Sequence, residues 1–86
     1  MGSLMAQKAV SSAVKREVNI GNFLLDRYKD RLSYFEHRYN IGTKDFLKKF
    51  ESGKMGDEED YFEWFAVAQA QSHWQSKIKE LKSQSN

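Results

Sequence analysis

The chain has 86 residues, of which 30% are charged and 14% aromatic, with a net charge of +2, no cysteine and no proline. This length allows one small domain with a marginal core, and the lack of cysteine excludes disulfides and thiolate metal sites. No apolar run approaches the length of a membrane span and the N-terminus lacks a secretory-signal layout, so we expect a cytoplasmic protein without membrane contact.

Charge is unevenly distributed along the chain. Residues 1–50 hold ten Lys and Arg against five Asp and Glu, a net +5, whereas residues 51–86 hold four against seven, a net −3. This asymmetry favours antiparallel self-association or the steering of a charged partner. It is also what two helices with solvated polar faces would show.

Frequent helix-forming residues and the lack of proline predict an all-α protein. We divide the chain into a flexible segment at 1–12, which begins with a cloning remnant (MGSL), one helical-hairpin domain at 13–82, and a polar tail at 83–86. The stretch 8–20 is compatible with a helix, a strand or a disordered arm. We favour a helix or an unsettled arm, because no second strand follows for it to pair with.

The first long helix is predicted from an N-cap at Asn22 to about Tyr39. A glycine precedes this cap, and apolar residues then recur at alternating spacings of three and four. Asn40 or Gly42 is expected to end the helix in a left-handed conformation. Thr43 is expected to cap a short helix from residue 44 to about residue 52, which Gly53 ends.

The second long helix is predicted from Asp57 to Leu81. Asp57 can cap its first turn, and the acidic residues that follow complement the positive end of the helix dipole. Its apolar stripe contains both tryptophans. We therefore predict an antiparallel helical hairpin of two long helices joined by a short bridging helix. The predicted structural core is Leu25, Tyr28, Leu32, Phe35, Tyr61, Trp64 and Phe65.

The two long helices differ in predicted length. At 1.5 Å per residue the last helix is about 36 Å long and the first about 27 Å. The end of the last helix is then uncovered, unless residues 8–20 extend the first helix or a second chain packs there. We prefer a homodimer. The candidate interface residues, for a second copy of the chain or for a partner protein, are Trp74, Ile78, Leu81, Val14 and Val18.

No enzyme signature is present. His37 and His73 stand alone, without the spacing of a metal site, and the acidic cluster at 57–60 is explained by the helix dipole. The chain has neither a nucleophile elbow nor a phosphate-binding loop. We therefore expect no catalytic residue, no metal and no cofactor.

The basic first half suggests an alternative function in nucleic-acid binding. Tyrosines lie among its basic residues, as in many nucleic-acid surfaces, although aromatic residues on a helix seam more often belong to the core. The candidate nucleic-acid contacts are Arg27, Arg31, Arg38, Lys48 and Lys49.

The segment from Tyr34 to Ala66 carries a short motif of aromatic, glycine and acidic positions. The motif residues are Tyr39, Gly42, Thr43, Phe46, Phe50, Gly53, Gly56, Asp57, Asp60, Tyr61 and Trp64. It resembles small prokaryotic helical-hairpin proteins of antitoxin-like type, except that Asn40 and Ile41 stand where a bare Tyr-Gly is commoner. The resemblance implies a non-enzymatic module that binds and restrains a partner protein such as a toxin.

Overall fold

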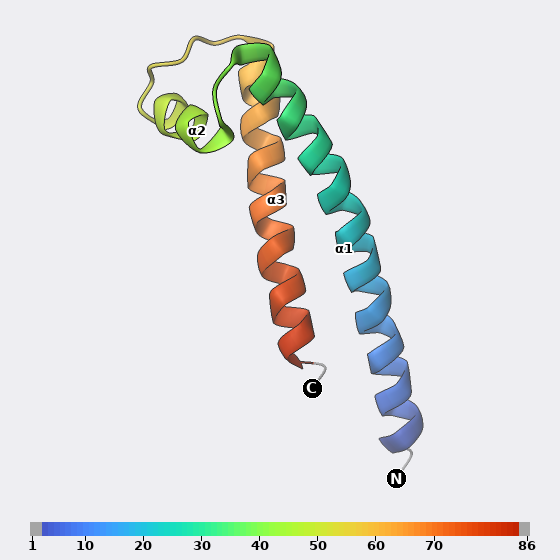
Figure 1. Cartoon of the computed structure of the whole chain (residues 1–86). Helices are drawn as coiled ribbons and strands as arrows, with labels where there is room; N and C mark the ends of the chain where they lie inside the picture. The colour runs from blue at the N-terminus through green and yellow to red at the C-terminus, as the bar shows by residue number, and fades with distance from the viewer. Residues whose placement is uncertain (1–2, 85–86) are drawn as a thin grey trace.

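A computed structural model describes residues 3–84 of the chain, with side-chain surroundings for residues 11–83. Over residues 3–84 the chain forms three helices and no strand: α1 (Ser3–Tyr39), α2 (Thr43–Glu51) and α3 (Glu59–Gln84). Helices α1 and α3 pack side by side in opposite directions, and α2 connects them at the closed end (Figure 1). The predicted all-α hairpin with a short bridging helix is thereby confirmed.

Helix α1 is longer than predicted and has no break at Gly21 or Asn22. The predicted start at Asn22 is wrong, and residues 3–12, expected to be flexible, form the first turns of the same helix. The glycine serves close packing instead of termination. A Cβ atom at Gly21 would lie 2.7 Å from Ile78 Cδ1 and 2.7 Å from Trp74 Cε3, so only glycine lets the two helices approach this closely.

The closed end is shaped by two residues with positive φ. Asn40 (φ 53°) follows the last residue of α1, and Gly53 (φ 74°) follows α2, as the sequence predicted. Thr43 is not the N-cap, because Gly42 occupies that position without a side-chain cap. Glu36 of α1 takes over this role: its Oε2 accepts a hydrogen bond of 2.8 Å from the backbone N–H of Thr43.

Helix α3 begins at Glu59, two residues after the predicted cap at Asp57. Glu59 and Asp60 lie in its first turn, where carboxylates favour the positive end of the helix dipole. The helix continues to Gln84, so the predicted polar tail at 83–86 begins within its last turn, and residues 85–86 lie outside the described chain.

The core is built around Trp64, which is fully buried. Its ring lies parallel to that of Phe46 of α2, with centroids 3.9 Å apart, and stacks on Phe35 of α1 at 5.5 Å. Its indole N–H donates a 3.0 Å hydrogen bond to Thr43 Oγ1. Leu32 is also buried. The other predicted core residues, Leu25, Tyr28, Tyr61 and Phe65, are half-buried along the same contact.

Replacing Trp64 with alanine should unfold the domain. Truncating a fully buried aromatic side chain costs roughly 3–5 kcal/mol, which is comparable with the whole stability of a small domain. The loss is measured by urea denaturation followed by circular dichroism. A Trp64→Ala protein that keeps a cooperative transition close to that of the wild type would contradict the central role of this side chain.

Replacing Gly21 with leucine should destabilise the hairpin by about 1–3 kcal/mol, because the new side chain enters a space already filled by α3. The matched control is Asn22→Leu, one residue further along α1 and exposed, which should change stability by less than about 0.5 kcal/mol. Equal urea midpoints for the two variants would show that α3 does not pack on Gly21.

Candidate interaction surface

The apolar end of α3 is covered by α1 of the same chain. Ile78 is only 7% exposed and faces Gly21, while Trp74 and Leu81 are half-buried. Lys77 Nζ lies 3.3 Å from Glu17 Oε1 and 4.5 Å from the centroid of the Trp74 ring, which ties this end of α3 to α1.

Val14 and Val18 are half-buried on the α3 side of α1, where they line a shallow groove together with Lys82. The five residues predicted as an interface with a second copy therefore lie along the contact between α1 and α3. Of the two solutions open from the sequence, the structure takes the extension of the first helix by residues 8–20. Because α1 packs on this end of α3 within one chain, an uncovered apolar stripe no longer favours a homodimer. The homodimer stays a prediction.

Two arginines at the closed end are held by carboxylates of α3. Arg31 Nε and Nη2 both donate to the Glu63 carboxylate, with 3.0 Å between Nη2 and Oε1. Arg38 Nε lies 3.3 Å from Asp60 Oδ2, which also accepts a 2.6 Å hydrogen bond from the Tyr39 hydroxyl. These contacts fasten α1 to the first turns of α3.

The same contacts shift the acidity of the groups that make them. The hydrogen bond from Arg31, together with its charge, lowers the pKa of Glu63 below its ordinary value. The hydrogen bond to Asp60 raises the pKa of the Tyr39 hydroxyl, because it favours the protonated form. Arg31 and Arg38 are thus already engaged within the fold, as the directions of these shifts reflect.

The candidate nucleic-acid residues do not form one continuous surface. Arg27, Arg31 and Arg38 follow each other along α1, whereas Lys48 and Lys49 are exposed on α2. Helix α2 projects from the closed end on the side of α3 opposite α1 (Figure 1). The structure therefore separates these five residues into two groups.

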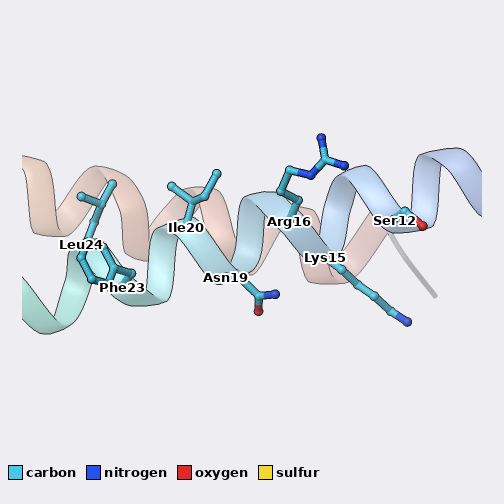
Figure 2. A pocket seen from close by; sticks show the side chains of 7 residues that line it. All are labelled: Ser12, Lys15, Arg16, Asn19, Ile20, Phe23 and Leu24. Atoms are coloured by element: carbon cyan, nitrogen blue, oxygen red, sulfur yellow. The ribbon is translucent and has the colours of Figure 1, made fainter.

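An apolar patch lies on the outer face of α1, away from α3. Ile20 is 45% exposed and Phe23 is 60% exposed, although both are large apolar residues. With Leu24 they form the apolar part of a shallow, open hollow (Figure 2). The remaining lining residues are Ser12, Lys15, Arg16 and Asn19. We call this hollow the outer-face patch.

Cationic side chains border the outer-face patch. Arg16 and Lys15 line it on the N-terminal side, and the Arg27 guanidinium lies 5.3 Å from the centroid of the Phe23 ring on the other. Such a stacked guanidinium remains a charged donor while its flat face covers the aromatic ring. Next along the helix, Arg31 lies 4.8 Å from the ring of the exposed Tyr34.

The patch was not predicted from the sequence, because the predicted apolar row was the one that faces α3. Residues 16, 20, 23 and 27 also recur at spacings of four, three and four, which places them on one face of a helix. The predicted helix start at Asn22 left residues 16 and 20 outside the helix, so the four residues were not recognised as one face.

Neither a metal site nor a membrane helix is found in the described part of the chain. Among its residues no group of three or more His, Asp or Glu is placed to hold a metal ion. No helix within residues 3–84 is long and apolar enough to cross a membrane. The hollows found along α1 are open to solvent, and the molecule is only about 20 Å across its two shorter dimensions (22 and 18 Å).

Comparison with known proteins found no matching family description, no matching curated protein and no matching solved structure. The resemblance to antitoxin-like hairpin proteins and the cytoplasmic location therefore stay predictions.

Exchanging Glu63 for glutamine should make the free energy of unfolding depend less on pH in the acidic range. Since the folded-state pKa of Glu63 is lowered, its contribution is fully present above the ordinary glutamate value of 4.5 and is lost as pH falls through the folded value. The wild type should therefore lose more stability than Glu63→Gln between about pH 5 and pH 3, as measured by urea denaturation.

The control for this prediction is Glu80→Gln, an exposed glutamate near the other end of α3. This variant should follow the wild-type pH dependence. Parallel curves for the wild type and Glu63→Gln would contradict the pairing of Glu63 with Arg31.

Proposed function

We propose that this protein is a non-enzymatic protein–protein interaction module. The observation that carries the proposal is the outer-face patch, where Phe23 and Ile20 are 60% and 45% exposed although the hairpin does not need them for its own core. Exposed apolar patches with a polar border are typical of interaction sites, and aromatic and arginine side chains are the residues that interfaces favour.

The finer proposal is that the module binds and restrains its partner, as an antitoxin does a toxin. Its support is the resemblance of the segment Tyr34 to Ala66. Within that segment Tyr39, Phe46 and Thr43 all contact Trp64 at the closed end. The motif thus builds the end of the hairpin, and the exposed face of α1 is left to contact the toxin or other restrained protein.

Nucleic-acid binding is the second candidate. It is favoured by the alternation of Arg16, Arg27 and Arg31 with the exposed rings of Phe23 and Tyr34, since bases stack on aromatic side chains beside cations. It is disfavoured by the engagement of Arg31 and Arg38 with carboxylates of α3.

Affinity capture with and without nuclease distinguishes the two candidates. The tagged full chain is exposed to lysate of its source organism, and bound protein and nucleic acid are quantified. One protein retained in stoichiometric amount after nuclease treatment is the expected result. Recovery of nucleic acid, or loss of all bound protein on nuclease treatment, would contradict the interaction-module proposal in favour of the second candidate.

The capture experiment has an internal control in the Phe23→Ala variant. Because Phe23 contributes an exposed side chain, the variant should fold like the wild type, which circular dichroism checks. Retention of the same protein should fall by at least about tenfold if a side chain of this kind anchors the interface. Unchanged retention would place the interface elsewhere on the molecule.

A further inference from the structure

We propose that the outer-face patch docks an acidic amphipathic helix of the partner protein, laid along α1 between residues 12 and 27. This inference rests on the proposed function and gives its partner a chemical class. It starts from the geometry of the patch: the hollow follows the axis of α1, and α3 lies behind α1 as seen in Figure 2, so the face is open along its whole length.

The spacing of the patch fits a helix better than an extended or globular element. Arg16, Ile20, Phe23 and Arg27 stand at relative positions 0, 4, 7 and 11 of α1, which is the repeat of a helix–helix seam. Apolar side chains occupy the two middle positions, and an arginine occupies each end. A facing helix would therefore place two apolar residues in the middle and a carboxylate near each arginine.

The distance between the two arginines sets the pattern of the partner. Eleven residues of helix span about 16 Å. A partner helix that follows this row matches it with acidic residues about eleven positions apart and apolar residues four and seven positions from the first of them. Bidentate pairing of carboxylates with guanidinium groups gives such a contact both register and orientation.

The charge of the patch favours an acidic partner. Its cations are Lys15, Arg16 and Arg27, of which Arg27 also covers Phe23. Of the nearby acidic residues, Glu17 pairs with Lys77 of α3, whereas Asp30 lies one turn on from Arg27 and lines a neighbouring hollow together with Arg27 and Arg31. No acidic side chain is among the residues that line the patch, so its charge is positive and is strongest at the end formed by Lys15 and Arg16.

A second copy of this chain fits the patch less well. In an antiparallel pair, the register that places Ile20 against Phe23 of the other copy also places Arg16 against Arg27 of the other copy, since 20 + 23 and 16 + 27 are equal. Like charges directly opposed across an interface are unfavourable. A partner of opposite charge buries the same apolar residues without this repulsion.

The test is site-specific photo-crosslinking in cells of the source organism, with p-benzoylphenylalanine in place of Phe23. The matched control carries it in place of Phe62, which is also an exposed phenylalanine (55%) but belongs to α3. Crosslinked material is isolated and the crosslinked peptide is sequenced. The expected result is one protein, crosslinked from position 23 through an amphipathic helical segment with acidic residues about eleven positions apart.

The segment so identified is then synthesised and titrated against the full chain. Arg16→Glu with Arg27→Glu should weaken its binding by at least about tenfold, because two charge pairs become repulsive. Arg16→Lys with Arg27→Lys should weaken binding less than the glutamate changes, because the positive charges remain and only the bidentate pairing is lost. Binding should also weaken as NaCl is raised from 0.05 to 0.5 M, a range over which exposed charges are increasingly screened.

The outcomes separate this inference from the proposed function. Crosslinks from position 23 to nucleic acid, lipid, a second copy of the chain or a segment without acidic residues would overturn the inference. If position 62 captures a protein in stoichiometric amount and position 23 does not, the interaction module stands and its docking face is wrong. If neither position captures a protein, both proposals fail.

Discussion

The hairpin depends on the environment of one side chain, Trp64. Its ring faces Phe46 at 3.9 Å and Phe35 at 5.5 Å, so a single residue of α3 contacts both other helices. Its buried indole N–H needs an acceptor, and Thr43 Oγ1 supplies one at 3.0 Å. Because Thr43 is the first residue of α2, this hydrogen bond fixes where the bridging helix starts as well as where α3 packs.

From this closed end the two long helices run side by side, and their close approach depends on Gly21. The missing side chain there lets Ile78 and Trp74 approach the backbone of α1. Since α1 passes this point without a break, it packs on Trp74 and Ile78 near the end of α3, where Ile78 is buried and Trp74 is half-buried. The face of α1 that points away from α3 then carries Ile20 and Phe23 into solvent, which is why a functional interpretation centres on that face.

The sequence predicted the parts of the structure that depend on local chemistry. The ends of α1 and α2 follow from Asn40 and Gly53, which adopt positive φ, and the buried positions of Leu32, Phe35 and Trp64 follow from helical periodicity. The start of α1 was not predictable in this way. A glycine followed by asparagine is a common helix boundary, and only the neighbouring helix shows that Gly21 is a site of close packing.

Thr43 was predicted in the wrong role, and the outer-face patch was not predicted. As a sequence signal, a threonine before a short helix predicts a cap, whereas its hydroxyl here accepts a hydrogen bond from a residue 21 positions away. The patch was divided by the misplaced helix boundary. For Thr43 the deciding partner is distant in sequence, whereas the row of the patch follows helical spacing once residues 16–27 are assigned to one helix.

The central claim is that one chain closes the hairpin by itself and leaves the outer face of α1 free. Isotope-filtered nuclear Overhauser spectroscopy on an equal mixture of labelled and unlabelled protein tests it directly. We predict contacts between Gly21 Hα and the Ile78 methyl groups within the labelled chain and none between chains. Contacts seen only between labelled and unlabelled molecules would show that a second copy covers α3, which would contradict the account.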